Sequence, residues 1–411
     1  MSDESVVQPE RQVRWDGTTV APGDVVAFDG RRAPLFRLVL KNIVLTILTV
    51  GIYRFWAKTA VRRWFWRLIS IAEERLEYTG KASELLVGFL IAMCILLPFF
   101  AVTSILEQMA STSVAGTIAA QVVYFLGLFL LIQAAIFRMR RYRLTRTMWR
   151  GIRCGLDGRT LDYVKAGVGY WLLVIVTLGF AYPWMRAGLS RHLMTRTRFG
   201  AQNFGFEVTA RALLVHWAPV AWVWLGILGC IAIGWASGDP YPQGPINEIA
   251  GFTGLAMILL LVAQIPLYVR YRVREFRIFA AGTSLGEVGF ESDLRVSQII
   301  WLYLGAGLLL LLVIGFLAIL AGGFLVGPMG SSPAGPEAGL AFLPVFFVVL
   351  IGLVVAMPII NLVIIQFGLA RAVAGSVKIR NLPAVESIIQ STEATPGHGE
   401  GLADALDLGD F

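Results

Sequence analysis

The chain is poor in charge, and long parts of it contain no lysine or arginine at all. Charged residues make up 15% of its 411 residues, against about a quarter in soluble domains, whereas hydrophobic residues reach 57%. None of the 35 lysines and arginines lies in 82–137, 212–269 or 296–370. The apolar runs within these windows are too long, and too apolar on all faces, for barrel strands. They exclude a soluble globular protein and predict a multi-spanning α-helical membrane protein, because each helix satisfies its own backbone in lipid.

Cysteine is equally scarce. Of the three cysteines, Cys94 and Cys230 lie inside apolar runs and Cys154 lies in a basic loop, with no paired spacing. This pattern implies no disulfide framework. The first 33 residues are polar and mixed in charge. We therefore expect no cleaved signal peptide.

Residues and motifs for catalysis are missing as well. The histidines His192, His216 and His398 fit no metal-site spacing with the cysteines. His216 could face a cavity, but we favour a hydrogen-bonded residue between packed helices. Walker loops, dinucleotide fingerprints and nucleophile elbows do not occur. The long apolar runs also contain no aspartate, glutamate, lysine or arginine, the charged residues that mark ion paths in membranes. We expect no metal site, no cofactor, no enzymatic activity and no proton- or sodium-coupled transport.

The positive charges that are present predict the topology. They gather in six blocks, and each cation-free window holds two apolar runs around a short turn. Because positively charged loops stay in the cytoplasm, we expect three helical hairpins with their turns outside and every basic loop inside. This all-α arrangement has six full spans and cytoplasmic termini. The paired runs are Leu85–Leu106 with Gly116–Phe137, Leu213–Trp235 with Ile249–Val269, and Ile299–Val326 with Leu340–Ala370.

Two further apolar segments, 38–53 and 166–185, have cations on both flanks. The uncharged part of the first gives a helix of roughly 18 Å, against about 30 Å for the apolar core of a bilayer. If both segments crossed, the blocks 54–81 and 138–165, with seven and nine cations, would lie outside. We therefore interpret both as re-entrant or interfacial segments. The second is long enough to cross, so there the charge argument alone decides.

Internal similarity divides the chain into three related units. At an offset of 128 residues, Thr49-x-Gly51 falls on Thr177-x-Gly179 and Trp56 falls on Trp184. At an offset of 84, Gly205-Phe206-Glu207 falls on Gly289-Phe290-Glu291, but this third unit has no short segment. The repeats enter and leave on one face, so they are parallel. We expect a polar segment at 1–27, units at 28–156 (hairpin 85–137), 157–280 (hairpin 213–269) and 281–381 (hairpin 299–370), and a disordered acidic tail at 382–411.

Short alternating stretches with glycine follow each basic run. Alternation over so few residues is weak evidence for strands, but it recurs after each run. We expect these strands to meet in a small cytoplasmic sheet. The stretches are 76–80, 151–156, 204–208 and 288–291.

Basic residues interleave with tryptophan at the end of each short segment. Aromatic belts and topology-setting cations explain such residues in any multi-span protein. A sharper hypothesis is binding of anionic lipid headgroups, to which each cation near the surface contributes about 1 kcal/mol. The two sets recur in register where a short segment would lie at headgroup depth. The candidate lipid-binding residues are Trp56, Lys58, Arg62, Arg63, Trp184, Arg186 and Arg191.

Three glutamines, Gln133, Gln264 and Gln366, lie about one turn inside the basic ends of equivalent helices. They are candidates for the lining of a vestibule around a pseudo-threefold arrangement. The ordinary explanation is that their amides form hydrogen bonds between packed helices, and we favour it.

Several short motifs resemble the YjgN-like family of bacterial inner-membrane proteins over roughly residues 28–300. They are Phe28-Asp29-Gly30, Thr49-x-Gly51-x-Tyr53-x-x-Trp56-x-Lys58, Glu77-Tyr78-Thr79-Gly80-x-x-x-Glu84-Leu85, Arg141-Tyr142-Arg143-Leu144 and Trp149-Arg150-Gly151-Ile152-Arg153. The last unit departs from the pattern, because no second Thr-x-Gly element follows Trp301-Leu302-Tyr303. The family is a domain of unknown function, so the resemblance implies an inner-membrane location and no chemistry.

The leading functional hypothesis is a non-enzymatic protein of the bacterial inner membrane that binds lipid or organises the membrane through its basic cytoplasmic face. Its expected partners are anionic membrane lipids. The net charge of +8 is explained by the topology, so we expect no nucleic-acid partner. The alternative is a channel or uncoupled transporter lined by the two short segments, for which the Thr-x-Gly elements are plausible break points. Substrate, oligomeric state and protein partners do not follow from the sequence.

Overall fold

The computed structural model describes residues 26–236, 245–329, 336–381, 383–384 and 388. Within these ranges, six helical stretches are long and apolar enough to cross a membrane. Their outward faces carry exposed large apolar side chains such as Leu97, Trp222 and Leu311, as expected of helices that face lipid. The predicted class, a mostly helical multi-pass membrane protein, is confirmed.

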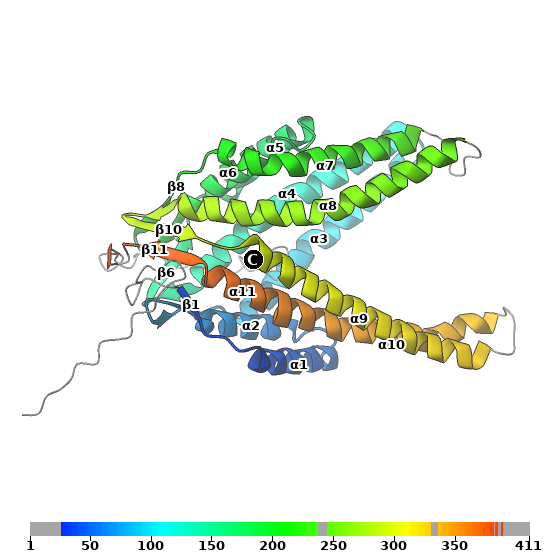
Figure 1. Ribbon diagram of the computed structural model, residues 1–411, viewed down its shortest axis with the longest axis horizontal. Helices are drawn as coiled ribbons and strands as arrows, with labels where there is room; N and C mark the ends of the chain where they lie inside the picture. The colour runs from blue at the N-terminus through cyan, green and yellow to red at the C-terminus, as the bar shows by residue number, and fades with distance from the viewer. Residues whose placement is uncertain (1–25, 237–244, 330–335, 382, 385–387, 389–411) are drawn as a thin grey trace, which may run out of the picture.

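The long helices pack in three antiparallel pairs that extend in one direction from a common base (Figure 1). The pairs are α3 (Ala82–Ala110) with α4 (Val114–Thr145), α7 (Ala210–Ala236) with α8 (Pro245–Ala281), and α9 (Val296–Met329) with α10 (Pro336–Ile359). Five of the six predicted apolar runs each lie within one of these helices, and the last, Leu340–Ala370, extends from α10 through two further helical segments.

The last span is not a regular α-helix along its whole length. After α10 it continues as the π-helical segment η1 (Ile360–Gln366) and then as α11 (Phe367–Ala374). Segments of π-helix are rare and recur at functional sites, because their wider turn displaces side chains from the usual register.

Each predicted short segment belongs to a pair of helices. The first pair comprises α1 (Arg32–Leu48) and α2 (Arg54–Leu68), and the second α5 (Thr160–Val176) and α6 (Tyr182–Met194). The segment 38–53 comprises the end of α1 and the turn that follows, whereas 166–185 reaches into both helices of its pair. Each pair folds back on itself, and its turn lies well short of the far ends of the long helices (Figure 1). The segment 166–185 is therefore not one continuous helix, and none of these four helices is long and apolar enough to span.

Both short pairs turn at the Thr-x-Gly element, as its small and polar residues predict. In the first pair, the amide of Gly51 donates to the carbonyl of Thr46 at 2.7 Å, and Val50 donates to Ile47 at 3.1 Å. This pattern is a Schellman motif, which requires a left-handed residue after the helix, and Val50 adopts φ 51° there. The hydroxyl of Thr49 then accepts the amide of Tyr53 at 2.9 Å and so starts α2.

The second pair repeats this geometry. Gly179 donates to the carbonyl of Val174 at 2.8 Å, and Leu178 has φ 50°. The hydroxyl of Thr177 accepts the amide of Ala181 at 3.0 Å. The same three contacts therefore reverse the chain in both places.

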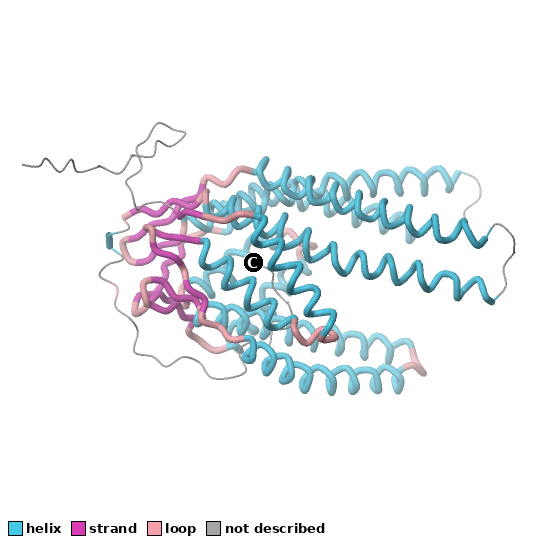
Figure 2. Tube along the Cα trace, turned by 90° about the horizontal axis from the view of Figure 1, so that it is seen from below, coloured by secondary structure: helices cyan, strands magenta, loops and turns pink. Residues whose placement is uncertain are grey.

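All strands gather at the base of the helices (Figure 2). Eight of them form one antiparallel sheet, in which each strand pairs with the next along the chain from β4 to β11. The sheet consists of β4 (Glu77–Tyr78), β5 (Thr147–Trp149), β6 (Ile152–Leu156), β7 (Thr197–Phe199), β8 (Gln202–Phe206), β9 (Thr283–Leu285), β10 (Val288–Ser292) and β11 (Val377–Arg380). The predicted sheet is confirmed. The prediction missed β5, β7, β9 and β11, which pair with the predicted stretches.

A second, three-stranded sheet is formed by β1 (Val26–Phe28), β2 (Ile69–Ile71) and β3 (Glu74–Arg75). The two sheets share one apolar core, to which Val26, Trp149 and Ile379 contribute from β1, β5 and β11. The strands thus hold the ends of all the helix pairs together. The predicted polar segment 1–27 and acidic tail 382–411 lie almost entirely outside the described residues.

Candidate functional site

A cavity of about 910 Å³ lies between the first short pair and the last long pair. Helices α1 and α2 form one side, and α9, α10 and η1 form the other. Its volume is in the range of pockets that hold small molecules or a large part of a lipid. Most of the lining is apolar, with residues such as Val39, Ile43, Leu310, Val354 and Met357.

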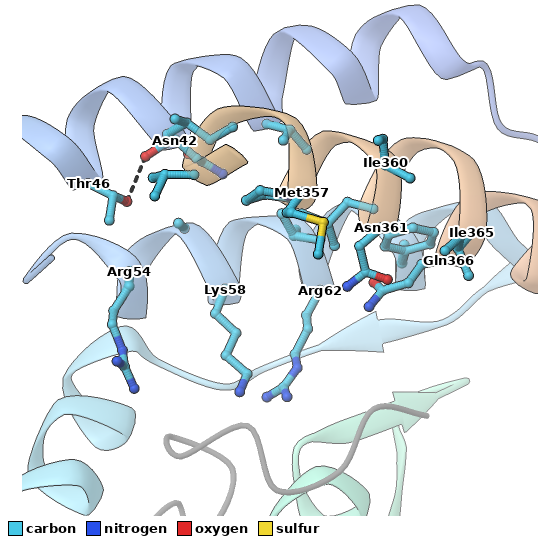
Figure 3. Close-up of a pocket in the computed structure, with 18 of the residues that line it drawn as sticks. Asn42, Thr46, Arg54, Lys58, Arg62, Met357, Ile360, Asn361, Ile365 and Gln366 are labelled. Carbon is cyan, nitrogen blue, oxygen red and sulfur yellow. Dashed lines mark hydrogen bonds between the residues drawn. The ribbon is translucent and has the colours of Figure 1, made fainter. Parts of the chain in front are cut away.

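Three cations line this cavity from α2. Arg54, Lys58 and Arg62 are spaced by four residues, which places them on one face of the helix, and Figure 3 shows them in a row. Arg54 also lies over the ring of Phe89, 5.1 Å from its centroid. Arg143, from the end of α4, adds a fourth cation to the lining. The cavity is therefore amphipathic, with apolar walls and a positively charged face.

A buried amide of α1 also lines the cavity. Asn42 is 5% exposed, and its backbone carbonyl accepts the hydroxyl of Thr46 at 2.7 Å. Its side-chain Nδ2 has no hydrogen-bond acceptor among the described residues. A buried donor without an acceptor costs about 1–3 kcal/mol. The site therefore contains a donor suited to an oxygen atom of a ligand.

The π-helical segment contributes polar groups on the opposite wall. Asn361 and Gln366 of η1 line the cavity, and Figure 3 shows them near Arg62. The same segment packs on α1 through Val363, which shares an apolar cluster with Leu35 and Val39. The cavity thus joins an irregular helix to a row of cations, an arrangement that suits an amphipathic anion.

The sequence profile of a family described as bacterial protein of unknown function (DUF898) matches residues 24–405, which includes every element that forms this cavity. The chain belongs to the DUF898 family. No curated protein and no solved structure matches it. The family description supplies no activity for this DUF898 protein, so any functional statement rests on its own residues.

The predicted lipid-binding residues of this DUF898 chain do not form one site. Lys58 and Arg62 line the cavity, and Arg62 also donates to the hydroxyl of Tyr78 at 3.4 Å. Trp56 and Trp184 are 41% and 39% exposed on their helices and are not among the lining residues.

The other predicted cations have partners within the DUF898 chain. Arg63 donates to the carbonyl of Gly80 at 2.8 Å, and Arg191 donates to that of Val208 at 3.0 Å. Both contacts join a short pair to the chain that leads into the next long helix. Arg63 in the first unit and Arg191 in the second therefore each stabilise the fold through a hydrogen bond to the backbone.

Arg186 forms a buried ion pair with Glu275 of α8, at 2.5 Å, and Glu275 is 2% exposed. A second arginine, Arg272, pairs with the other oxygen of the same carboxylate. Burial lowers the pKa of Arg186, but the charge and hydrogen bond of Glu275 outweigh it, so the pKa lies above its ordinary value. At the offset of 128 residues, Arg186 stands at the position of Lys58 in the first unit.

The three glutamines also differ from one another. Gln366 lines the cavity, whereas Gln133 is buried against α5, where a Cβ on Gly167 would lie 3.0 Å from its Oε1. The Oε1 atoms of Gln133 and Gln264 are buried without a donor among the described residues. The vestibule prediction stays untested, and only Gln366 is placed at the cavity.

Motif residues of the DUF898 chain have clear structural roles. Glu84 accepts two hydrogen bonds from Arg146, at 2.9 and 3.1 Å, and one from Tyr142 at 3.1 Å, which joins the start of α3 to the end of α4. Gly80 is required because a Cβ there would lie 2.6 Å from the Tyr78 ring. These motifs therefore specify the base of the helices.

Sequence reasoning missed Asn42, Arg54, Arg143 and Asn361 as site residues. A polar residue inside an apolar run was the available signal for both asparagines, since such residues are costly in a membrane segment. The two arginines had no distinguishing signal, because each belongs to a block of similar cations. Among the described residues, no group of histidine, cysteine and acidic side chains could hold a metal ion.

Proposed function

We propose that this protein is a non-enzymatic inner-membrane protein that binds an anionic membrane lipid in the cavity between α1–α2 and α9–α10–η1. The termini are cytoplasmic in this proposal, and the base of strands faces the cytoplasm, because the positively charged blocks lie there. The motif resemblance to the YjgN-like family supports the same location. Both short pairs are then re-entrant from the cytoplasmic side.

One observation carries the proposal: a single cavity combines apolar walls with a row of cations. Acyl chains suit the walls formed by Ile43, Leu310 and Val354. A phosphate group suits the face of Arg54, Lys58 and Arg62, each of which adds electrostatic attraction to an anionic headgroup. The orphan Nδ2 of Asn42 would donate to an ester or phosphate oxygen.

The first test removes charge from the cavity. We expect the double variant Arg54→Gln/Lys58→Gln, purified in mild detergent, to retain at least fivefold less phosphatidylglycerol in native mass spectrometry than the unaltered protein. The matched control is Arg67→Gln/Arg75→Gln, which removes the same charge from exposed positions outside the lining. Equal lipid retention by the two double variants would overturn the proposal.

A steric variant makes the same test without any change of charge. Gly307 of α9 lines the cavity, and a Cβ there would meet no atom within 4 Å, so Gly307→Leu fills open space. Gly315, two turns further along α9, is equally open but outside the lining, so Gly315→Leu is its control. Only Gly307→Leu is expected to lower lipid retention.

A channel or uncoupled transporter is the second candidate, and the depth of Arg54 favours it. Arg54 is the first residue of α2 and directly follows the turn of the first pair. The row Arg62, Lys58 and Arg54 therefore leads from the base toward the turn (Figure 3). Non-helical backbone at membrane depth is tolerated where it is buried in protein or faces water. Such a row would suit the passage of an anion.

Cysteines placed one at a time along 46–52 separate the two candidates, in a background without Cys94 and Cys230. The lipid proposal predicts no reaction with membrane-impermeant thiol reagents from either face, and a water-filled path predicts reaction at several positions. Cys154 will not interfere, because burial raises its pKa to about 11 and leaves little thiolate at neutral pH.

A further inference from the structure

A second cavity, of about 430 Å³, lies on the other side of the molecule from the first short pair, at the base of α7 and α8. Its walls come from elements far apart in the sequence. They include His216 of α7, Arg274 and Arg277 of α8, Ser292 of β10 and Lys378 of β11. The position, where the long helices meet the sheet, is that of lipid headgroups and of the adjoining solvent in a membrane-spanning chain.

Two arginines of this cavity have no anionic partner among the described residues. Arg274 and Arg277 are three residues apart, so they lie on one face of α8. The Nε of Arg274 is buried and has no hydrogen-bond acceptor. Buried polar groups without partners are rare in folded proteins, and each one calls for an explanation.

The acidic residues of the cavity do not supply that partner, because each pairs with another cation. Asp293 pairs with Lys378 at 3.1 Å, and Glu291 pairs with Arg380. Both pairs join β11 to β10 or to the residue after it. The charge of Arg274 and Arg277 is therefore left for a group that is not part of the described chain.

We propose that this cavity binds a phosphate group, either in a lipid headgroup or in a free phosphate. Guanidinium groups match the oxygens of phosphate with paired hydrogen bonds, and two of them meet here. His216 lines the same cavity from the neighbouring helix and adds a further donor when its ring nitrogen faces the ligand. The site is independent of the lipid cavity described above, with which it shares no residue.

The test uses the full chain in the Arg54→Gln/Lys58→Gln background, so that the first cavity contributes as little as possible. Inorganic phosphate is titrated by calorimetry in one arm, and short-chain phosphatidylglycerol is counted by native mass spectrometry in the other. The double variant Arg274→Gln/Arg277→Gln is expected to weaken binding of at least one probe by tenfold or more. The control Arg211→Gln, at an exposed residue near the start of α7, is expected to change it by less than twofold.

Loss of phosphate binding identifies a soluble ligand, and loss of lipid alone identifies a headgroup. Circular dichroism checks that each variant is folded. If the double variant does not fold, His216→Gln is measured instead. This variant removes the imidazole ring but keeps both arginines, and it should weaken binding about threefold. Failure of the parent protein to bind either probe, or equal binding by the variants and the control, would overturn the proposal. In that case the arginines act only as topology-setting cations.

Discussion

The two short helix pairs share one turn and differ in what lies against them. Both reverse the chain with a threonine hydroxyl, a left-handed residue and a glycine, and both have an arginine bonded to a carbonyl of the following segment. Yet α1–α2 borders a cavity of about 910 Å³, whereas in the second pair α6 packs against α7 and α8 and α5 packs against α4. The shared motif therefore determines the turn, but it does not determine which residues pack beside the helix pair.

Aromatic residues fill that space in the second unit. Tyr182 stacks on Trp217 with 4.3 Å between ring centroids, and Tyr271 lies 5.0 Å from Trp217. The indole of Trp217 also donates to the carbonyl of Gly179 at 3.0 Å, which ties the turn to α7. Tyr182 stands at the position of Arg54, at the offset of 128. A single exchange of a cation for an aromatic ring thus accompanies the change from an open site to a packed one.

The largest effect is expected from the ion pair between Arg186 of α6 and Glu275 of α8. Glu275→Gln removes the buried carboxylate that pairs with Arg186 and Arg272, whose side chains are 31% and 43% exposed, so we expect the free energy of unfolding to fall by about 2 kcal/mol. Denaturant unfolding in detergent, followed by tryptophan fluorescence, measures it. Glu291→Gln is the control, because its pair with Arg380 is exposed and should contribute less than about 1 kcal/mol. Equal losses would show that this ion pair does not hold α5–α6 in place.

A smaller effect is expected from the threonines of the two turns. Thr49→Val and Thr177→Val each remove one acceptor of a backbone amide, which should cost about 1 kcal/mol. The turn of α5–α6 has further support from Trp217, whereas a Cβ on Gly51 would meet no atom within 4 Å. Hydrogen exchange should therefore rise more at 49–53 than at 177–181. A larger rise at the second turn would contradict this account.

Much of the helical fold could be predicted because membrane insertion depends on local composition. The six spans follow from the apolar runs, and the hairpins follow from the position of the cations. The second strand of each β-hairpin was visible as an alternating stretch after a basic run. The first strands, such as Thr197–Phe199, were not, because a run of three residues directly after a helix carries no usable period.

The candidate site could be predicted only in part, because it depends on contacts between distant residues. Lys58 and Arg62 were identified, but the sequence holds no sign that α1 packs on η1, more than 300 positions away. The same limit applies to Arg186, whose role depends on Glu275. A block of similar cations does not reveal which of its members have a partner inside the protein.

The order of the strands bears on how the protein is made. Every strand of the larger sheet pairs with its neighbour in the sequence, so the sheet can lengthen by one β-hairpin each time a helix pair leaves the ribosome. The pairs β5–β6, β7–β8 and β9–β10 are local hairpins, whereas the other pairs close over one helix pair each, which costs more loop-closure entropy. Each strand of this sheet therefore has to wait for at most one helix pair before its next partner is synthesised.

The first cavity is an exception to this sequential assembly. Its walls come from α1 and α2, among the first helices to be synthesised, and from α9, α10 and η1, among the last. Until translation reaches η1, the face of α1 that carries Leu35 and Val39 is covered only by α2, and the part that later packs on Val363 and Phe367 is open to the surrounding lipid. A lipid that covers this face during synthesis would be enclosed when the final helices arrive, so the protein can acquire its first ligand while it is being made.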